Sequence, residues 1–284
     1  MKPLLMVPVL FAALVMPGAG RATTGTEVVR TVYFSALDSK GVAVTDLTVA
    51  DLAVKEGGKN GVIRNVEPAT APLALSLLVD DGGSGSFQPA VAQFLQTLIG
   101  HGVFAIRALN PQASKLTDFT DDTVALRTAL GGIGPRGRIT SIGEQIVEAV
   151  REAAADLRQR RAVRPAIVVV TVIGEQLQSA QADATLSALQ NSGASLSVVH
   201  MSYLQLGHVL GDGPGRSGGM IQSVGSGVPP GPAVAKVAAH YLHQYALTYA
   251  LPEGVKPNEK LSVTTNRKGV TLLAPTRIPD LSNP

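Results

Sequence analysis

Leu73-Ala74-Leu75-Ser76-Leu77-Leu78-Val79-Asp80-Asp81-Gly82-Gly83-Ser84-Gly85-Ser86 is the stretch from which the fold class follows. Its apolar first half predicts a buried strand, and the helical spacing over 90–99 predicts a helix after it. Between them lies an acidic turn rich in glycine and serine. In open α/β folds, ligands bind at the carboxyl ends of the parallel strands. The oxygen atoms of this turn suit a hard cation.

Strand and helix patterns alternate from Ala71 onward, which predicts a mostly parallel sheet covered by helices on both faces. The run from Ala166 to Ile173 is the most apolar of the mature chain and predicts a central buried strand. Further strands are expected over 103–109, 115–119 and 195–201, and further helices over 123–130, 140–161, 180–191 and 233–242.

Short β patterns joined by tight turns occupy the segment before this domain and the end of the chain. Three closing strands, over 244–250, 261–265 and 269–274, are expected to join either the main sheet or the N-terminal segment. The predicted organisation is a signal peptide over 1–22, a small β-rich segment over 23–70 and an α/β domain over 71–284. The Gly-, Pro- and Ser-rich stretch 207–231 is predicted to be a long loop, functional or mobile.

The chain resembles the von Willebrand factor type A (VWFA) domain, whose metal-ion-dependent adhesion site begins with Asp-x-Ser-x-Ser. Here the corresponding register reads Asp80-x-Gly82-x-Ser84. Secreted bacterial VWFA-related proteins carry a similar preface, matched here by Asp38, Gly41, Val44, Leu47, Asp51, Leu52, Val54, Glu56 and Gly58, and a similar tail, matched by 244–249 and 266–270. The resemblance covers nearly all of the mature chain and implies a VWFA-like (Rossmann-like) sheet.

The resemblance also implies a magnesium site built from three loops. Asp80 and Ser84 match the first loop and Thr140 matches the second, but Gly82 and Ile173 stand where the family has a serine and an aspartate. Either Asp81 or Glu175 substitutes for the missing ligands, or the turn kept its shape after its metal role lapsed. We favour the second interpretation, with Gly82, Gly83 and Gly85 supplying unusual dihedral angles, and expect no tightly bound metal.

An enzymatic alternative is a serine hydrolase centred on Ser84. The turn 82–86 lies between a strand and a helix, as a Gly-x-Ser-x-Gly nucleophile elbow does, although Ser86 replaces the last glycine. His208 is then the only reasonable general base. Two other patterns are weaker indications of function. Residues 213–218 match the letters of a dinucleotide-binding fingerprint, but they do not directly follow a predicted strand and open a helix. His240 and His243 lie one helical turn apart, but no third metal ligand accompanies them in the sequence.

Composition restricts the compartment and the partners. A cation at Lys2, an apolar core and small residues up to Ala22 predict a cleaved signal peptide rather than a membrane anchor. Its removal lowers the formal net charge from +3 to +1, and the chain has no cysteine. The cluster of Arg158, Arg160, Arg161 and Arg164 is expected to end a helix rather than to bind nucleic acid, because no aromatic side chains interleave it.

These observations predict an exported, non-enzymatic binding module that is secreted or periplasmic. Its partner is expected to be a protein or a cell-envelope ligand, with no nucleic acid and no stable membrane insertion after signal cleavage. The expected ligand-binding residues lie at the carboxyl edge of the sheet, namely Asp80, Asp81, Ser84, Ser86, Thr140 and Glu175. Neighbouring stretches 136–140, 173–176 and the surroundings of Asp212 complete this face.

Overall fold

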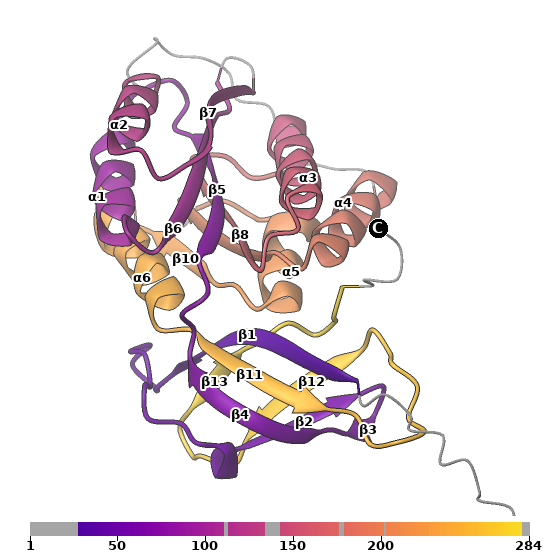
Figure 1. Cartoon of the computed structure of the whole chain (residues 1–284). Helices are drawn as coiled ribbons and strands as arrows, with labels where there is room; N and C mark the ends of the chain where they lie inside the picture. Colours follow the sequence, from indigo (N-terminus) through magenta and orange to yellow (C-terminus); the bar gives the residue numbers. More distant parts are fainter. Residues whose placement is uncertain are drawn as a thin grey trace, which may run out of the picture.

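The computed structural model describes residues 28–110, 113–133, 143–175, 179–201, 203–225 and 227–279. The predicted signal peptide and Thr140 lie outside these ranges. An α/β unit and an antiparallel β-rich unit are stacked on each other, with the chain crossing between them more than once (Figure 1). Among the described helices, none has the length and apolar character needed to span a bilayer.

The α/β unit contains the predicted sheet, in the strand order β10-β9-β8-β5-β6-β7. All neighbouring strands pair in parallel except β7, which runs antiparallel to β6 at one edge. The mostly parallel α/β fold is therefore confirmed. Its strands are β5 (Leu73–Asp80), β6 (Gly102–Ala108), β7 (Ser114–Thr120), β8 (Arg164–Thr171), β9 (Ser195–Met201) and β10 (Ile221–Val224).

Among the described residues, three helices cover each face of the sheet (Figure 1). They are α1 (Gln88–Leu98), α2 (Thr123–Gly131) and α6 (Gly231–Leu242) on one face, and α3 (Gly143–Gln159), α4 (Ser179–Ser192) and α5 (His208–Ser217) on the other. Successive side chains of β8 alternate between these faces. Val168 packs in the core cluster of the first three helices, whereas Ile167 and Val169 pack in that of the other three. Burial on both faces explains the continuous apolar run of this strand.

Strands from both ends of the chain form the β-rich unit. A four-stranded sheet has the order β13-β1-β11-β4, and a three-stranded sheet has the order β12-β2-β3. Of the two placements predicted for the closing strands, pairing with the N-terminal segment is the one observed. The strands are β1 (Val29–Leu37), β2 (Leu52–Glu56), β3 (Lys59–Asn60), β4 (Val62–Pro68), β11 (Tyr245–Ala250), β12 (Leu261–Thr265) and β13 (Thr271–Leu273), with a 3-10 turn, η1 (Val49–Asp51).

The prediction of a long loop over 207–231 is wrong. This stretch contains α5, β10 and the start of α6. Helix α5 includes three glycines and Pro214, which locally disfavour a helix. Its Gly213 lies so close to β9 that an added Cβ would be 2.9 Å from the Leu196 side chain. Packing against the sheet therefore overrides the local preference, and the missing side chain of Gly213 permits the close approach.

A buried arginine joins the two units. Arg164, the first residue of β8, donates hydrogen bonds to the side-chain oxygen of Gln244 and to the backbone carbonyls of Ala69, Ala71 and Tyr241. Ala69, Ala71 and Gln244 lie in the segments that connect the units, and Tyr241 lies in the last turn of α6. Arg164 was expected to end a helix with its neighbours in sequence, and that expectation is wrong, because α3 ends at Gln159 and Arg164 belongs to the sheet.

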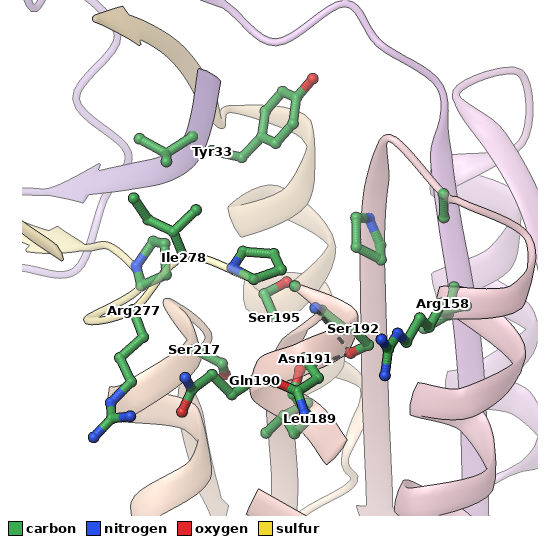
Figure 2. Close-up of a pocket in the computed structure, with 18 of the residues that line it drawn as sticks. Tyr33, Arg158, Leu189, Gln190, Asn191, Ser192, Ser195, Ser217, Arg277 and Ile278 are labelled. Carbon is green, nitrogen blue, oxygen red and sulfur yellow. Dashed lines mark hydrogen bonds between the residues drawn. The ribbon is translucent and has the colours of Figure 1, made fainter. Parts of the chain in front are cut away.

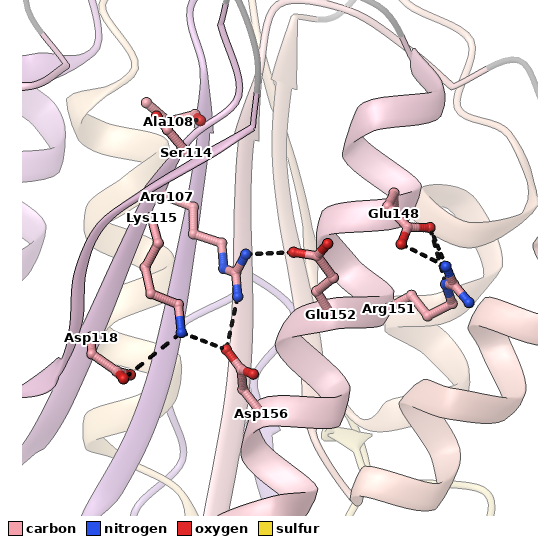
Figure 3. Close-up of polar contacts among 9 residues, drawn as sticks. All are labelled: Arg107, Ala108, Ser114, Lys115, Asp118, Glu148, Arg151, Glu152 and Asp156. Atoms are coloured by element: carbon pink, nitrogen blue, oxygen red, sulfur yellow. Dashed lines mark hydrogen bonds and ion pairs between the residues drawn. The ribbon is translucent and has the colours of Figure 1, made fainter.

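An ion-pair network secures the antiparallel edge of the main sheet (Figure 3). Arg107 of β6 contacts Glu152 at 2.5 Å and Asp156 at 2.8 Å, both on α3. Lys115 of β7 also reaches Asp156, at 3.2 Å. The Arg107 side chain is nearly buried, so its two carboxylate partners compensate for the loss of hydration. The network thus connects β6, β7 and α3.

Candidate functional site

The turn over 80–86 lies at the carboxyl end of β5, as the sequence predicts. Gly82, Gly83 and Gly85 have φ angles of 65°, 75° and 74°. Residues other than glycine are strained in this left-handed region. The expectation that these glycines supply unusual dihedral angles is confirmed. The shape of the turn therefore depends on its glycines.

Asp80 is buried and held by the fold. Its Oδ1 accepts hydrogen bonds from the backbone N–H of Gly82 at 3.1 Å and from the side-chain amide of Asn110. Asn110 follows β6, the neighbouring strand, and is itself buried. Sequence reasoning missed Asn110, although a polar residue shortly after a predicted strand could have identified it. The carboxyl ends of β5 and β6 are thereby joined.

Asp81 and the two serines differ in their exposure. Asp81 is buried, its Oδ1 accepts from the N–H of Gly83 at 3.0 Å, and its Oδ2 has no hydrogen-bond partner within the described ranges. Ser84 and Ser86 are exposed, with their hydroxyl oxygens 2.7 Å apart. The hydroxyl of Ser84 also donates to the Asp81 carbonyl at 2.8 Å. The turn therefore presents a pair of hydroxyls to solvent and buries its carboxylates.

The loop after β8 carries no carboxylate at position 173. The Ile173 side chain packs against the core cluster that includes α3 and α5. Its backbone N–H donates to the Thr171 hydroxyl at 3.0 Å, and its carbonyl accepts from that hydroxyl at 2.9 Å. An apolar side chain at this place extends the core toward the edge of the sheet, where the resemblance implied a metal ligand.

Glu175 caps a helix. Its carboxylate accepts hydrogen bonds from the backbone N–H groups of Val209, in the first turn of α5, and of Leu210, the latter at 2.8 Å. The first N–H groups of a helix lack internal partners, and a carboxylate also interacts favourably with the helix dipole. Burial raises the pKa of Glu175, an effect that the two hydrogen bonds partly oppose. This capping role was not foreseen from the sequence.

The donor set of this edge does not fit the magnesium ion that the resemblance implies. Gly82 and Ile173 offer no side-chain oxygen, and the oxygens of Glu175 are engaged with α5. Among the described residues of the turn, one buried oxygen, Asp81 Oδ2, is left over. In the part of the chain that the structure describes, no group of three or more His, Asp or Glu side chains is arranged to hold a metal. Thr140 lies outside that part.

The residues of the hydrolase alternative show no general base beside Ser84. Among the described contacts, the Ser84 hydroxyl meets Ser86 and the Asp81 backbone. His208, the predicted base, begins α5 and has its Nδ1 3.3 Å from the carboxylate of Asp212. Asp212 belongs to the same helix, where it also lies 3.6 Å from Arg216. Serine activation requires a base within hydrogen-bond reach.

The two histidines at the end of α6 have different surroundings. His240 is buried, and burial together with nearby Arg164 lowers its pKa to about 3, so its ring is neutral. Its ring lies edge-on to that of Tyr241, with centroids 4.7 Å apart. His243 follows the helix and is exposed. The geometry indicates packing for His240 rather than metal binding.

The α/β unit has the sheet and helix layers that the resemblance to VWFA domains implies. A six-stranded sheet has β5 and β8 at its centre, one antiparallel edge strand and three helices on each face, and the acidic turn follows β5. The fold is VWFA-like.

Comparisons with known proteins give structural likenesses alone. No family model matches the chain, and no curated protein matches its sequence. The VWA domain of SpRpn10 is 12% identical over 60% of this chain and 97% of that chain, with a TM-score of 0.47. A von Willebrand factor type A protein from Catenulispora acidiphila is 9% identical over 87% of this chain and 73% of its own, with a TM-score of 0.49.

A third similar structure is proximal thread matrix protein 1 from the mussel byssus, which has a zinc-occupied metal-ion-dependent adhesion motif. It is 10% identical over 66% of this chain and 50% of that chain, with a TM-score of 0.48. The bound zinc is a property of that protein. The VWFA-like description of the present chain rests on its own strand order and helix layers.

Proposed function

We propose that this chain is an exported, non-enzymatic module that binds a protein or cell-envelope ligand through the carboxyl edge of its sheet, without a tightly bound metal. The observation that carries the proposal is the exposed hydroxyl pair of Ser84 and Ser86 on a glycine turn. Hydroxyls on a turn that is already ordered bind a partner at a small entropic cost.

The surroundings of the pair support hydrogen-bond recognition over metal-mediated recognition. Asp80 and Glu175 are occupied with structural hydrogen bonds, so the exposed surface of the turn carries hydroxyls rather than carboxylates. Loops at this edge are where open α/β folds bind ligands. Fold likeness does not itself establish an activity, and the proposal depends on these residues.

A pull-down from a cell-envelope fraction tests the proposal. The purified chain is compared with Ser84→Ala/Ser86→Ala and with the control Thr97→Ala, which removes a hydroxyl from exposed α1 surface. We expect one set of retained components for the parent and the control, unchanged by a chelator, and loss of it with the double variant. Equal retention by all three proteins contradicts the proposal, and dependence on added magnesium contradicts its metal-free part.

An active-site serine probe tests the non-enzymatic part. We expect no covalent labelling of Ser84 by a fluorophosphonate, because no described base lies within reach of its hydroxyl. Labelling of the parent that Ser84→Ala abolishes would support the hydrolase alternative instead.

A further inference from the structure

A large cavity lies at the opposite, amino-terminal edge of the sheet, between the two units (Figure 2). Its volume is about 1210 Å³. Strand β1 forms one wall, the beginnings of β8 and β9 and the end of α4 form another, and residues 275–279 pass along it. We call this cavity the arginine groove because six arginines line it: Arg30, Arg158, Arg161, Arg164, Arg216 and Arg277.

The side chains that line the arginine groove carry more positive than negative charge. Asp183 is the one acidic residue among those that line it. Arg30, Arg216 and Arg277 pair with Glu56, Asp212 and Glu259, which lie outside the lining. Arg161 and Arg164 have no carboxylate partner within the described ranges, and Arg164 is instead surrounded by backbone carbonyls. The groove is therefore complementary to a negatively charged ligand.

A free strand edge borders the same groove. Strand β13 pairs with β1 over residues 35–37 of β1 alone. The chain then departs, and Pro275 forms a bridge with Ser217 while Arg277 forms one with Lys260. Over residues 29–34, one edge of β1 pairs with β11. The other edge of this segment has no strand partner in the part of the chain that the structure describes. Such an edge is a template for an added strand.

We propose that the arginine groove binds an extended acidic segment of a partner protein, which adds as a strand to the free edge of β1 with its carboxylates toward the arginines. Backbone hydrogen bonds to the edge would supply affinity, and charge pairs would supply selectivity. The two features are independent, because one is a property of side chains and the other of the backbone. This surface is distinct from the carboxyl edge and does not depend on the function proposed there.

The lining favours a peptide over a nucleic acid. Single-stranded nucleic acids are bound by aromatic side chains that stack on the bases. Tyr33 is the one aromatic residue that lines the groove. A free strand edge, in contrast, recognises another polypeptide backbone.

Selection of short random peptides displayed on phage tests the proposal. The purified chain is compared with Arg161→Glu/Arg277→Gln and with the control Arg127→Glu/Arg151→Gln, which makes the same charge change outside the groove. Arg277 and Arg151 are matched, since each is ion-paired and about half exposed. We expect peptides rich in Asp and Glu, with binding weakened at least about tenfold by the groove variant and unchanged by the control.

Two measurements on a selected peptide test strand addition. Amide hydrogen exchange should slow over residues 29–34 when the peptide binds, and methylation of alternate peptide nitrogens should weaken binding. The Ser84→Ala/Ser86→Ala variant should still bind the selected peptide, because its substitutions lie at the carboxyl edge and outside the arginine groove. The proposal is overturned if the selected peptides are not acidic, if both charge variants bind equally, if N-methylation has no effect, or if oligothymidylate displaces the peptide at equal charge concentration.

Discussion

The two edges of the main sheet use charged residues in opposite ways. At the carboxyl edge, Asp80, Asp81 and Glu175 are buried, and hydrogen bonds from backbone or amide groups hold them in place. At the amino edge, arginines gather around a cavity, and Arg161 is exposed without a carboxylate partner in the described chain. The carboxylates of the first edge hold its own loops, whereas at the second edge buried Arg164 joins the two units and Arg161 remains exposed.

This difference shows that a buried polar group at a sheet edge is not by itself evidence of a binding site. A carboxylate that accepts backbone N–H bonds stabilises the loop it belongs to or contacts. Binding requires groups that remain accessible after the fold is complete. The exposed hydroxyls of Ser84 and Ser86 at one edge and the exposed Arg161 at the other meet that condition.

The largest effect is expected for Val169→Asp in β8, the strand whose two ends reach the two edges. Val169 is fully buried, so the variant places a charge in the core without a partner, at a cost of several kcal/mol. We expect insoluble or unfolded protein, measured by the soluble yield and by circular dichroism. Val163→Asp, one residue before the strand and 68% exposed, is the control and should fold. A soluble Val169→Asp protein with an unchanged melting temperature would show that the core is not where we place it.

A smaller but still large effect is expected for Arg164→Met. This variant tests whether Arg164, at the amino edge, stabilises the contact between the two units. The variant removes the Arg164 donor from the part-buried carbonyls of Ala69 and Ala71 and from the buried carbonyl of Tyr241. We expect a loss of about 2–4 kcal/mol in the free energy of unfolding.

Urea denaturation measures this loss, and Arg161→Met is the control, because Arg161 is exposed. If both variants unfold at the same urea concentration as the parent, Arg164 does not hold the units together.

A moderate, pH-dependent effect is expected for Glu175→Gln at the carboxyl edge. Because burial raises the pKa of Glu175, the folded state holds its proton more tightly than the unfolded state does. Stability from this group is therefore fully present below the unfolded pKa, about 4.3, and is lost as the pH rises through the folded pKa. The stability of the parent relative to Glu175→Gln should decrease over that interval.

Thermal unfolding of both proteins from pH 4 upward measures this difference. At neutral pH, Glu175→Ala should cost about 1 kcal/mol through loss of the helix cap. A relative stability that increases with pH would mean that the carboxylate is better solvated than the structure shows.

The smallest effect is expected from magnesium or manganese. At millimolar concentration either ion should leave the melting temperature nearly unchanged, because Gly82 and Ile173 replace two of the oxygen ligands of the family pattern and the Glu175 oxygens accept hydrogen bonds from α5. Differential scanning fluorimetry measures the shift. A clear metal-induced increase that Asp80→Ala or Asp81→Asn abolishes would show that the carboxyl edge retains a metal site.

A gain-of-function variant sharpens this test. Gly82→Ser with Ile173→Asp supplies the two missing oxygen ligands of the family pattern. Gly82 has a φ of 65°, so a serine there is strained unless the turn rearranges. We therefore expect the double variant to be less stable than the parent without metal and to regain stability when magnesium is added. No response to the metal would contradict the residue matching between this turn and the family motif.

The sequence by itself determined the α/β class, the central strand over 166–173 and the position of the acidic turn. Each of these follows from short-range information: the period of apolar side chains, an uninterrupted apolar run, and glycines that permit left-handed dihedral angles. It also placed Ser84 and Ser86 in this turn, where the structure shows both side chains exposed.

Only the tertiary structure decided which polar groups the fold uses for itself. Glu175 meets residues more than thirty positions later, and Arg164 meets carbonyls about eighty to ninety-five positions away. Such contacts depend on how distant elements pack, as do helix α5 within a glycine-rich stretch and the pairing of the closing strands with β1 and β2. Local propensities are weak compared with burial and hydrogen bonding in a packed protein, so distant partners determined the outcome.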